Sequence, residues 1–289
     1  MSELLRKLDD VPGVYAQAYA DDVLLMATGI DSFTISGRVQ EGIEAVRVWA
    51  DESGLSLCSN KTFATMFTWK RKWNYYPLKL MGEEIQLVDR VTYLGVTLDS
   101  KLSWIPHITE KSSKANRCLL LCRRAVGQTW GLSPKVMMWI YQTMIRPIMS
   151  YAVTVWAAGL ETRTCDLKLT YLQRRACLSV SSAYPGTPTV ALEMLLGLPP
   201  LPLFLKGVAV TGAYRLKQMG LWKDGYIKDT LAHQSHVNWC NRNSRNFPVL
   251  VFPGDLFNAR LNLQVRFNTS TEVSDPTVEG STVACFTNG

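Results

Sequence analysis

The chain has 289 residues, of which 47% are hydrophobic and 19% charged, a composition that supports a sizeable core in one large or two modest domains. Its formal net charge of +7 and its pI of about 9.0 favour a polyanionic partner. No apolar run is clean enough to span a bilayer, since Arg146 and Pro147 interrupt the best candidate at 144–160, and the N-terminus lacks a signal-peptide pattern.

The cysteines are spread along the chain without the spacing of a disulfide framework. Their number, seven, is odd. Both features suit a reducing compartment, so we expect an intracellular protein, in the nucleus or the cytoplasm. Cys118 and Cys122 lie four residues apart on a predicted helix and are expected to be core residues.

The first elements form a predicted hairpin. Residues 1–13 are expected to be the end of a helix, and residues 14–19 and 23–26 to be two strands joined by a two-residue turn of Asp21 and Asp22. Such a turn would present both carboxylates at its tip, where a divalent cation would relieve their repulsion. For a bare pair of aspartates, a polar turn without any chemistry is the commoner explanation.

A helix and two short strands are predicted next. Apolar residues recur every three or four positions from 33 to 53, which indicates an amphipathic helix with one buried side. Residues 55–58 and 63–67 are predicted strands, and the turn between them contains Lys61. From the pattern alone, Lys61 is a surface lysine in a turn.

Residues 70–76 mix positive charge with aromatic rings, which could stack on bases or hold phosphates. An ordinary hairpin loop shows the same mixture, and we favour that interpretation. Residues 78–88 are predicted to form a hairpin with alternating faces. Residues 91–98 are predicted as a strand in which Gly95 indicates a bulge or a close backbone approach.

The second half is predicted to be helical. Helices are expected from Ser103 to about 127, from Ser133 to Trp156 with a kink at Pro147, over 162–181, over 189–196 and over 201–219. A basic face on this bundle would suit the backbone of a nucleic-acid duplex, whereas for any single cation a solvated surface is the better explanation. The cations concerned are Lys114, Arg117, Arg123, Arg124, Arg174 and Arg175.

The character of the chain changes after residue 220. Residues 233–282 have little periodicity and many Asn, Ser, Thr and Pro residues, as expected of a linker. His233, His236 and Cys240 have no fourth ligand at a recognisable spacing, so we expect no zinc site. Residues 282–289 are predicted as a strand followed by Thr-Asn-Gly.

Three motifs resemble those of one enzyme family. The sequence YADD at 19–22, between hydrophobic runs, resembles the catalytic hairpin of reverse transcriptases. The run SGLSLCSNKT at 53–62 resembles the next palm motif in retroelements without long terminal repeats, and VTYLGVTLD at 91–99 resembles their primer-gripping hairpin. The resemblance covers roughly residues 14–220. Residues 282–289 resemble the opening of a ribonuclease H domain, with Asn288 in place of its metal-binding aspartate.

This resemblance implies an α+β fold. Residues 1–100 would be the C-terminal half of a polymerase palm, an antiparallel sheet with a packed helix, and 101–220 an all-helical thumb. A linker would occupy 221–281, and a stub of a ribonuclease H domain 282–289.

The implied reaction is templated nucleotidyl transfer. A DNA primer on an RNA template attacks a deoxynucleotide, with two Mg²⁺ ions at the reacting groups. Asp21 would bridge the metals and Asp22 would support the metal site. Tyr19 and the backbone at Gly95 would lie near the primer, and Lys61 would contact the triphosphate.

One departure from the family pattern bears on activity. The family's other metal-binding aspartate lies on an earlier strand, and no strand is expected before Val14, so we expect the chain alone to be inactive. One alternative is a non-catalytic, nucleic-acid-binding remnant of a degraded retroelement. Another is a product that does not fold, since a truncated sheet exposes an edge and an apolar face.

Overall fold

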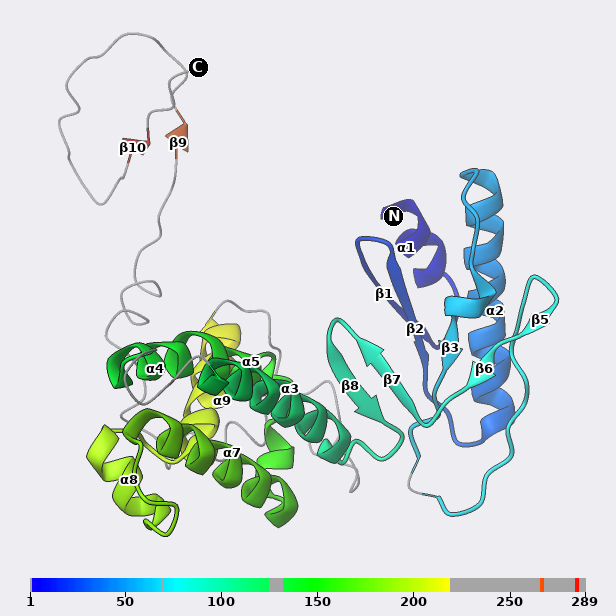
Figure 1. The fold of residues 1–289 in the computed structure, drawn as a ribbon. Helices are drawn as coiled ribbons and strands as arrows, with labels where there is room; N and C mark the ends of the chain where they lie inside the picture. Colours follow the sequence, from blue (N-terminus) through cyan, green and yellow to red (C-terminus); the bar gives the residue numbers. More distant parts are fainter. Residues whose placement is uncertain (1, 69, 125–131, 219–265, 268–283, 286–289) are drawn as a thin grey trace, which may run out of the picture. The chain divides into compact units, whose positions relative to one another are not determined.

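Helices and short strand pairs make up the fold in this computed structural model (Figure 1). It describes residues 2–68, 70–124, 132–218, 266–267 and 284–285. The chain divides into two compact units, residues 1–107 and 108–289, and each is described by itself. The mixture of helices and small sheets agrees with the expected α+β class.

In the first unit, helix α2 (Ser32–Glu52) provides the packing surface for the other elements. It begins where the Asp31 carboxylate accepts a hydrogen bond from the Thr34 amide at 2.8 Å, which satisfies one of the free amides of the first turn. Its buried side packs Trp49 against Leu4 and Leu8 of α1 (Ser2–Asp9). The predicted helix and its buried side are therefore confirmed.

The strands of this unit form small pairs. Strand β1 (Val14–Tyr19) pairs with β2 (Asp22–Ala27), β4 (Lys79–Leu80) with β5 (Glu83–Glu84), and β7 (Arg90–Tyr93) with β8 (Val96–Asp99), all antiparallel. Strand β3 (Phe63–Ala64) lies parallel to β6 (Gln86–Leu87). A hairpin is therefore present within the predicted 78–88, but its second strand is β5, and residues 86–87, predicted to belong to it, pair with β3 instead.

Residues 91–98 are not one strand with a bulge at Gly95, but the hairpin that the resemblance of 91–99 implies is confirmed. Tyr93 pairs with Val96, so Leu94 and Gly95 form a two-residue turn between β7 and β8. Both turn residues have positive φ, 45° and 74°, as a type I′ hairpin turn requires. Gly95 is placed there because glycine adopts this conformation without steric cost.

The predicted strand at 55–58 is also absent. The chain leaves α2 with the Leu55 amide bonded to the Ala50 carbonyl at 2.8 Å, and Ser59–Lys61 form a single 3₁₀ turn, η1. Among the described residues no strand lies beside 55–58 to pair with it, and only Leu57 packs against the core. The next strand is shorter than the predicted 63–67, because β3 ends at Ala64.

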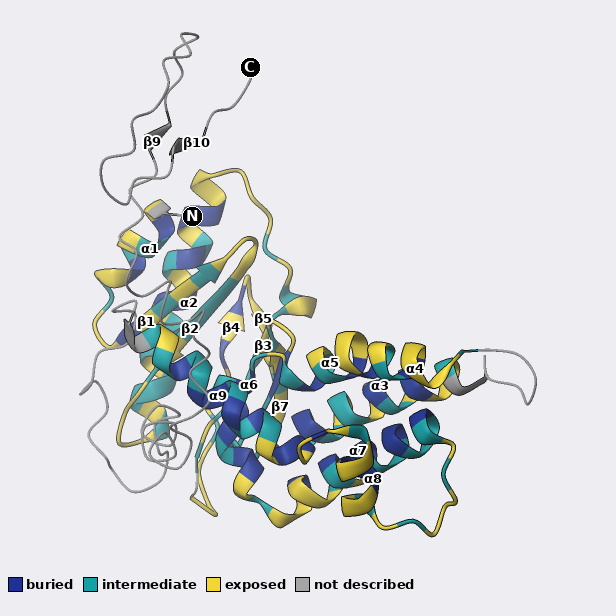
Figure 2. Cartoon of the chain, turned by 90° about the vertical axis from the view of Figure 1, so that its left-hand side faces the viewer, coloured by how far each residue is buried: buried dark blue, intermediate teal, exposed yellow. Residues whose placement is uncertain are grey.

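The second unit is helical. Its helices are α3 (Ile105–Arg124, whose first three residues belong to the first unit), α4 (Pro134–Ile140), α5 (Arg146–Ser150), α6 (Val153–Trp156), α7 (Arg163–Ser181), α8 (Thr189–Leu196) and α9 (Leu201–Gln218). A 3₁₀ turn, η3 (Ala157–Glu161), joins α6 to α7. In Figure 2, buried and exposed residues alternate around these helices, as expected when each buries one side.

A π-helical turn, η2 (Tyr141–Ile145), stands where a proline kink was predicted. The Arg146 amide donates to the Tyr141 carbonyl, five residues back instead of four. Pro147 has no amide proton and its ring would clash with the carbonyl four residues earlier, so the widened turn accommodates it. The helix then breaks at Ala152, whose φ is 51°. The prediction of one helix that continues to Trp156 is therefore wrong, because α6 is a separate helix after this break.

Most predicted helix ends in this unit are confirmed. Ser133 caps α4 through a hydrogen bond from the Val136 amide, and Gly197 follows α8 in the left-handed conformation with φ 62°. Helix α3 instead begins at Ile105, two residues after the predicted Ser103. The Asp99 carboxylate accepts from the amides of Ser103 and Trp104, at 3.0 and 3.1 Å, which holds these two residues in a turn before the helix.

Three polar side chains of unit 2 form a buried cluster: Tyr141, Gln173 and Glu193. The Tyr141 hydroxyl donates to Gln173 Oε1 at 2.8 Å, and Gln173 Nε2 donates to Glu193 Oε1 at 2.6 Å. The same amide nitrogen donates to the Pro199 carbonyl at 2.9 Å. The cluster therefore links η2 to α7, to α8 and to the loop between α8 and α9.

Burial raises the pKa of Tyr141 to about 12. The unfolded chain releases this proton near pH 10, whereas the folded chain retains it, so stability should fall as the pH rises from 10 towards 12. We expect this loss to be about 2 to 3 kcal/mol smaller in Tyr141→Phe, measured by chemical denaturation at each pH. Tyr171→Phe removes an exposed tyrosine of α7 and should leave the profile unchanged; equal profiles for both variants would contradict the prediction.

Little of the C-terminal region is described. Strand β9 (Arg266–Phe267) pairs with β10 (Ala284–Cys285) in parallel. The rest of the predicted linker and ribonuclease H stub, with His233, His236 and Cys240, lies outside the described residues. Within the described ranges, no single helix has the length and apolar composition to cross a membrane, although α8 and α9 pass that test together, with a 57° bend at their break.

Candidate active site

The two adjacent aspartates lie at the tip of the β1–β2 hairpin. Tyr19 pairs with Asp22, so the turn consists of Ala20 and Asp21, one residue earlier than predicted. Ala20 has a φ of 53°, in the left-handed region that alanine rarely adopts. Asp21 therefore lies in the turn itself, whereas Asp22 is the first residue of β2.

Both carboxylates are exposed. Asp22 lies on the solvent-exposed face of the hairpin, opposite Tyr19, whose ring is also exposed. In the described part of the chain, neither Asp21 nor Asp22 makes a side-chain hydrogen bond or an ion pair. Their oxygens are therefore available to a ligand from solution.

The two carboxylates suit a metal ion whose coordination shell is completed by water and by a substrate. Within the described residues, no group of three or more His, Cys, Asp or Glu side chains gathers where it could hold a metal. Asp21 and Asp22 supply carboxylate oxygens only, which Mg²⁺ accepts. Mg²⁺ is commonly bound by one or two carboxylates, with water and substrate phosphates as its other ligands. The pair fits such a partial site and does not fit a closed protein cage.

The buried face of the hairpin rests on α2. Val14 and Leu25 contact this helix at Gly42, where an added Cβ would come within 3.3 Å of Val14 Cγ1 and 3.4 Å of Leu25 Cδ1. Leu25 also packs against both core clusters of this unit. The close approach at Gly42 therefore sets the distance between the hairpin and the helix behind it.

We expect Gly42→Leu to destabilise the protein by about 1 to 3 kcal/mol, because the new side chain would push the hairpin away from α2. Gly37 is the matched control. It lies in the same helix with nothing within 4 Å of an added Cβ, so Gly37→Leu should be neutral or slightly stabilising through helix propensity. Chemical denaturation of the two variants tests this, and equal stability would contradict the contact at Gly42.

Lys61 and Gly95, the candidates for contacts with nucleotide and primer, lie on two elements outside the β1–β2 hairpin. Lys61 ends the 3₁₀ turn η1, and its side chain is exposed. Gly95 occupies the tip of the β7–β8 hairpin. No ion pair joins Lys61 to Asp21 or Asp22 among the residues described. The contacts expected of Lys61 and Gly95 with nucleotide and primer therefore stay predictions.

The basic residues of the helical unit differ in their surroundings. Lys114 and Arg117 are exposed and lie three residues apart on α3, so they share one side of the helix. The Arg175 guanidinium lies 5.8 Å from the centre of the Tyr171 ring. Arg123 and Arg124 end α3, and their side chains lie outside the described residues.

Arg174 has a structural role that the sequence did not indicate. Its guanidinium donates to the carbonyl oxygens of Thr187 and Pro185 and to the Thr189 hydroxyl, at 2.7, 2.5 and 3.0 Å. It thereby holds the loop between α7 and α8. Binding of a nucleic-acid phosphate by Arg174 stays a prediction, and it would compete with these three hydrogen bonds.

Two residues that connect β8 to the start of α3 were not predicted from the sequence. The Asp99 carboxylate fixes the turn before α3, as described above, and Nδ1 of the buried His107 accepts from the Thr97 amide at 3.1 Å. The spacing of Asp99 before a Ser-Trp turn is a weak signal that could have indicated a capping role. No sequence signal marks the contact of His107 with β8.

Comparison with protein families gives the site its context. Residues 1–98 match the reverse transcriptase family (RNA-dependent DNA polymerases). The reverse transcriptase match covers the β1–β2 hairpin, Lys61 and Gly95, so every palm candidate falls inside it. No solved structure matches the chain.

Curated relatives extend the likeness into the helical unit. The chain is 28% identical over 219 residues to the 115 kDa protein of the type-1 retrotransposable element R1DM of Drosophila melanogaster, covering 75% of this chain and 21% of that protein. It is 26% identical over 192 residues to the Pol polyprotein of the type-1 retrotransposable element R1 of Nasonia vitripennis, covering 64% of this chain and 57% of that protein.

A third relative is a named polymerase. The chain is 25% identical over 204 residues to the RNA-directed DNA polymerase from the mobile element jockey of Drosophila melanogaster, covering 69% of this chain and 22% of the polymerase. The chain therefore spans between a fifth and somewhat more than half of these relatives. The chain is therefore similar to reverse transcriptases over residues 1–98, and to proteins of retrotransposable elements over a longer stretch that continues into the helical unit.

Proposed function

We propose that this chain carries part of the catalytic centre of an RNA-directed DNA polymerase that copies the RNA of a retrotransposon without long terminal repeats. The observation that carries the proposal is the position of Asp21 and Asp22, exposed at the tip of a hairpin inside the segment that matches reverse transcriptases. The partners would be an RNA template, a DNA primer and deoxynucleotides.

Each residue of the centre has a defined task in this proposal. Asp21 and Asp22 hold the divalent metal, with Mg²⁺ the preferred ion because both ligands are hard oxygens. When bound, two such ions would activate the primer hydroxyl and stabilise the leaving pyrophosphate. Tyr19, beside Asp22 on the exposed face, would contact the primer end, Lys61 the triphosphate, and the Gly95 turn the primer backbone.

The isolated chain should not extend a primer. Two exposed carboxylates without a third in the described residues hold Mg²⁺ only weakly, because this ion demands a well-ordered octahedral shell.

The assignment of residues 1–100 to a palm, 101–220 to a thumb, 221–281 to a linker and 282–289 to a ribonuclease H stub belongs to the same proposal.

A split-polymerase assay tests the function. The N-terminal part of the jockey polymerase, ending before the segment that matches this chain, is mixed with this chain, and Mg²⁺-dependent primer extension on RNA is measured. We expect extension by the mixture and none by either part alone. The control is the same N-terminal part mixed with jockey's own C-terminal part. If the control extends the primer and the mixture with this chain does not, the proposal is wrong.

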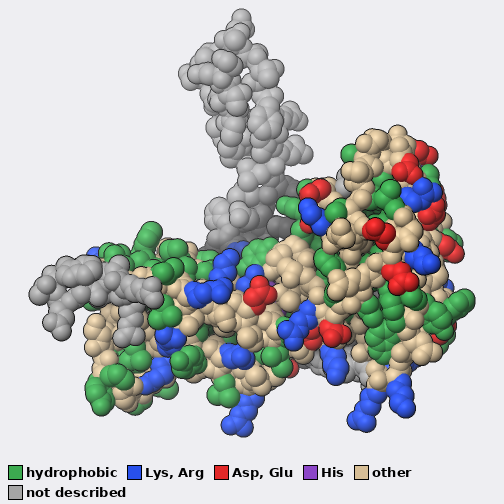
Figure 3. Space-filling view, turned by 45° about the vertical axis from the view of Figure 1, so that its right-hand side comes forward, with side chains coloured by type: hydrophobic (Ala, Val, Ile, Leu, Met, Phe, Trp, Pro, Cys, Tyr) green, Lys and Arg blue, Asp and Glu red, His purple; other side chains and the backbone are tan. Residues whose placement is uncertain are grey.

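A second function would need only the helical unit. Lys114 and Arg117 share an exposed side of α3, and on the face shown in Figure 3 the helical part carries Lys and Arg side chains with few acidic ones among them. This arrangement favours duplex binding through phosphates, without catalysis. In that case Lys114→Glu with Arg117→Glu should weaken duplex binding, while Asp21→Asn should change nothing in the split-polymerase assay.

A further inference from the structure

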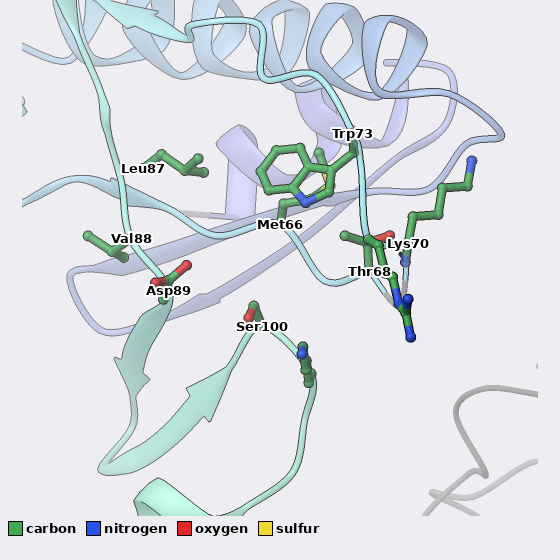
Figure 4. A pocket seen from close by; sticks show the side chains of 10 residues that line it. Met66, Thr68, Lys70, Trp73, Leu87, Val88, Asp89 and Ser100 are labelled. Carbon is green, nitrogen blue, oxygen red and sulfur yellow. Dashed lines mark hydrogen bonds between the residues drawn. The ribbon is translucent and has the colours of Figure 1, made fainter.

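A cavity in the first unit lies away from the aspartate hairpin. It has a volume of about 300 Å³ and is formed by the loop after β3, the end of β6 and the turn after β8. The residues that bear on its chemistry are Met66, Arg71, Trp73, Asp89, Ser100 and Lys101. Figure 4 shows the indole of Trp73 beside Met66, with Asp89 and Ser100 on the opposite side of the space.

Backbone hydrogen bonds tie the three segments together. The Thr68 amide donates to the Ser100 carbonyl at 3.3 Å, and the Ser100 amide donates to the Asp89 carbonyl at 3.0 Å. At the other end, the Val88 amide donates to the Ala64 carbonyl at 2.8 Å. The walls are therefore held in place without a ligand, as in binding sites that are largely formed beforehand.

Lys70 belongs to the lining, but its ammonium group anchors the loop. Its ammonium donates to the Ile30 carbonyl at 3.1 Å, and its amide donates to the Thr68 hydroxyl at 3.2 Å. Figure 4 shows this side chain extending away from Trp73 and Asp89. The cations left to bind a ligand are consequently Arg71 and Lys101.

The chemistry of the lining is that of a stacking surface with cations at its rim. Trp73 lines the cavity and is 36% exposed, so its ring is accessible to a ligand there. Arg71 and Lys101 are exposed, and within the described residues neither forms an ion pair. Asp89 is an exposed acceptor with no ion pair in the same part of the chain.

We propose that this cavity binds one unpaired nucleotide of a single-stranded RNA or DNA. The base would stack on the Trp73 indole, the phosphates on either side would pair with Arg71 and Lys101, and Asp89 would accept from a base amino group. A duplex does not suit the cavity, because its bases are already stacked on one another. The proposal goes beyond the polymerase function, since none of these residues belongs to the β1–β2 hairpin.

The volume agrees with a single nucleotide. Cavities that bind small molecules start at about 300 Å³, which is the size found here. The two cations outnumber the one carboxylate, so the charge of the lining is complementary to a strand backbone and not to a cationic ligand.

The test measures binding of labelled oligonucleotides to the full chain by fluorescence anisotropy. One probe is a short single strand, and the other has the same length and charge but lacks bases. We expect the base-bearing probe to bind more tightly. Trp73→Ala should weaken its binding on the order of tenfold, the usual size of one lost stacking contact, and leave the abasic probe unchanged.

Matched variants keep the test decisive. Trp139→Ala removes a tryptophan of α4 that is 62% exposed, and it should have no effect. Trp73→Phe keeps a stacking ring and should restore most of the affinity, which separates stacking from misfolding. Arg71→Gln and Lys101→Gln should weaken both probes and reduce the salt dependence of binding, whereas Lys72→Gln, next to Arg71 but outside the lining, should not.

The outcomes that would overturn the proposal are specific. If Trp73→Ala behaves like Trp139→Ala, or weakens the abasic probe equally, the cavity does not bind a base. Neither result affects the polymerase proposal, because that proposal is tested by Asp21 and extension.

Discussion

Replacing Asp21 with asparagine should lower primer extension in the split-polymerase assay by at least about a hundredfold. Loss of a group that only orients a metal ligand already costs about 10- to 100-fold, and an asparagine removes a charged ligand itself. Asp21 is exposed, and within the described residues its side chain has no partner, so the fold should not change. The rate of extension over a range of Mg²⁺ concentrations, with circular dichroism as the check on folding, measures the effect.

Asp10→Asn is the matched control for this experiment. Asp10 is an exposed aspartate that follows α1, outside the hairpin, and its loss should leave extension unchanged. Asp22→Asn should lower the rate less than Asp21→Asn, since Asp22 is proposed to support the metal site and not to bridge the ions. Equal rates for Asp10→Asn and Asp21→Asn would show that Asp21 does not hold the metal.

Replacing Gln173 with leucine should destabilise the protein by about 3 to 5 kcal/mol. Gln173 is fully buried, and its amide bonds to Tyr141, Glu193 and the Pro199 carbonyl at the same time. A leucine of similar size would leave a hydroxyl, a carboxylate and a carbonyl without their partner in a nearly dry interior. Each such group costs about 1 to 3 kcal/mol, and a charged one costs more.

Gln142→Leu provides the comparison, because Gln142 is an exposed glutamine of the π turn. A surface substitution of this kind normally changes stability by less than about 0.5 kcal/mol. Urea denaturation of both variants measures the difference. A loss below about 1 kcal/mol in Gln173→Leu would mean that water or a rearranged side chain replaces the three hydrogen bonds.

The aspartate hairpin could be predicted because its signals are local. Largely apolar runs on both sides of Asp21 and Asp22 indicate two strands joined by a two-residue turn, and the structure has such a pair of strands. The turn itself was misplaced by one residue because Ala20 occupies the left-handed position. Alanine is not a turn residue in sequence patterns, since its Cβ disfavours that conformation, whereas glycine at 95 marked a special backbone position correctly.

Features that depend on distant residues were not predictable. The cavity brings Trp73 and Arg71 together with Asp89 and Lys101, although only the first two form a recognisable cluster in the sequence. Arg174 was predicted from its charge alone, but its three acceptors belong to a loop whose path follows from the packing of α7 and α8. Composition identifies charges, and the fold decides which of them reach the solvent.

The π turn constrains the length of its segment more than its composition. Arg146 lies over the Tyr141 ring, 5.4 Å from its centre, because five residues in a widened turn bring the two side chains to the same side. In a regular α-helix, each residue advances by about 100°, so the same pair would point in different directions. Side chains at 142–144 are exposed and should tolerate substitution. Deleting one of them would leave Tyr141 and Arg146 four positions apart, a spacing that still shares one side of a regular α-helix. The deletion would, however, turn α4 by about 100° about the helix axis relative to α5 and remove the widened turn before Pro147. Evolutionary insertions and deletions should therefore be rarer here than exchanges.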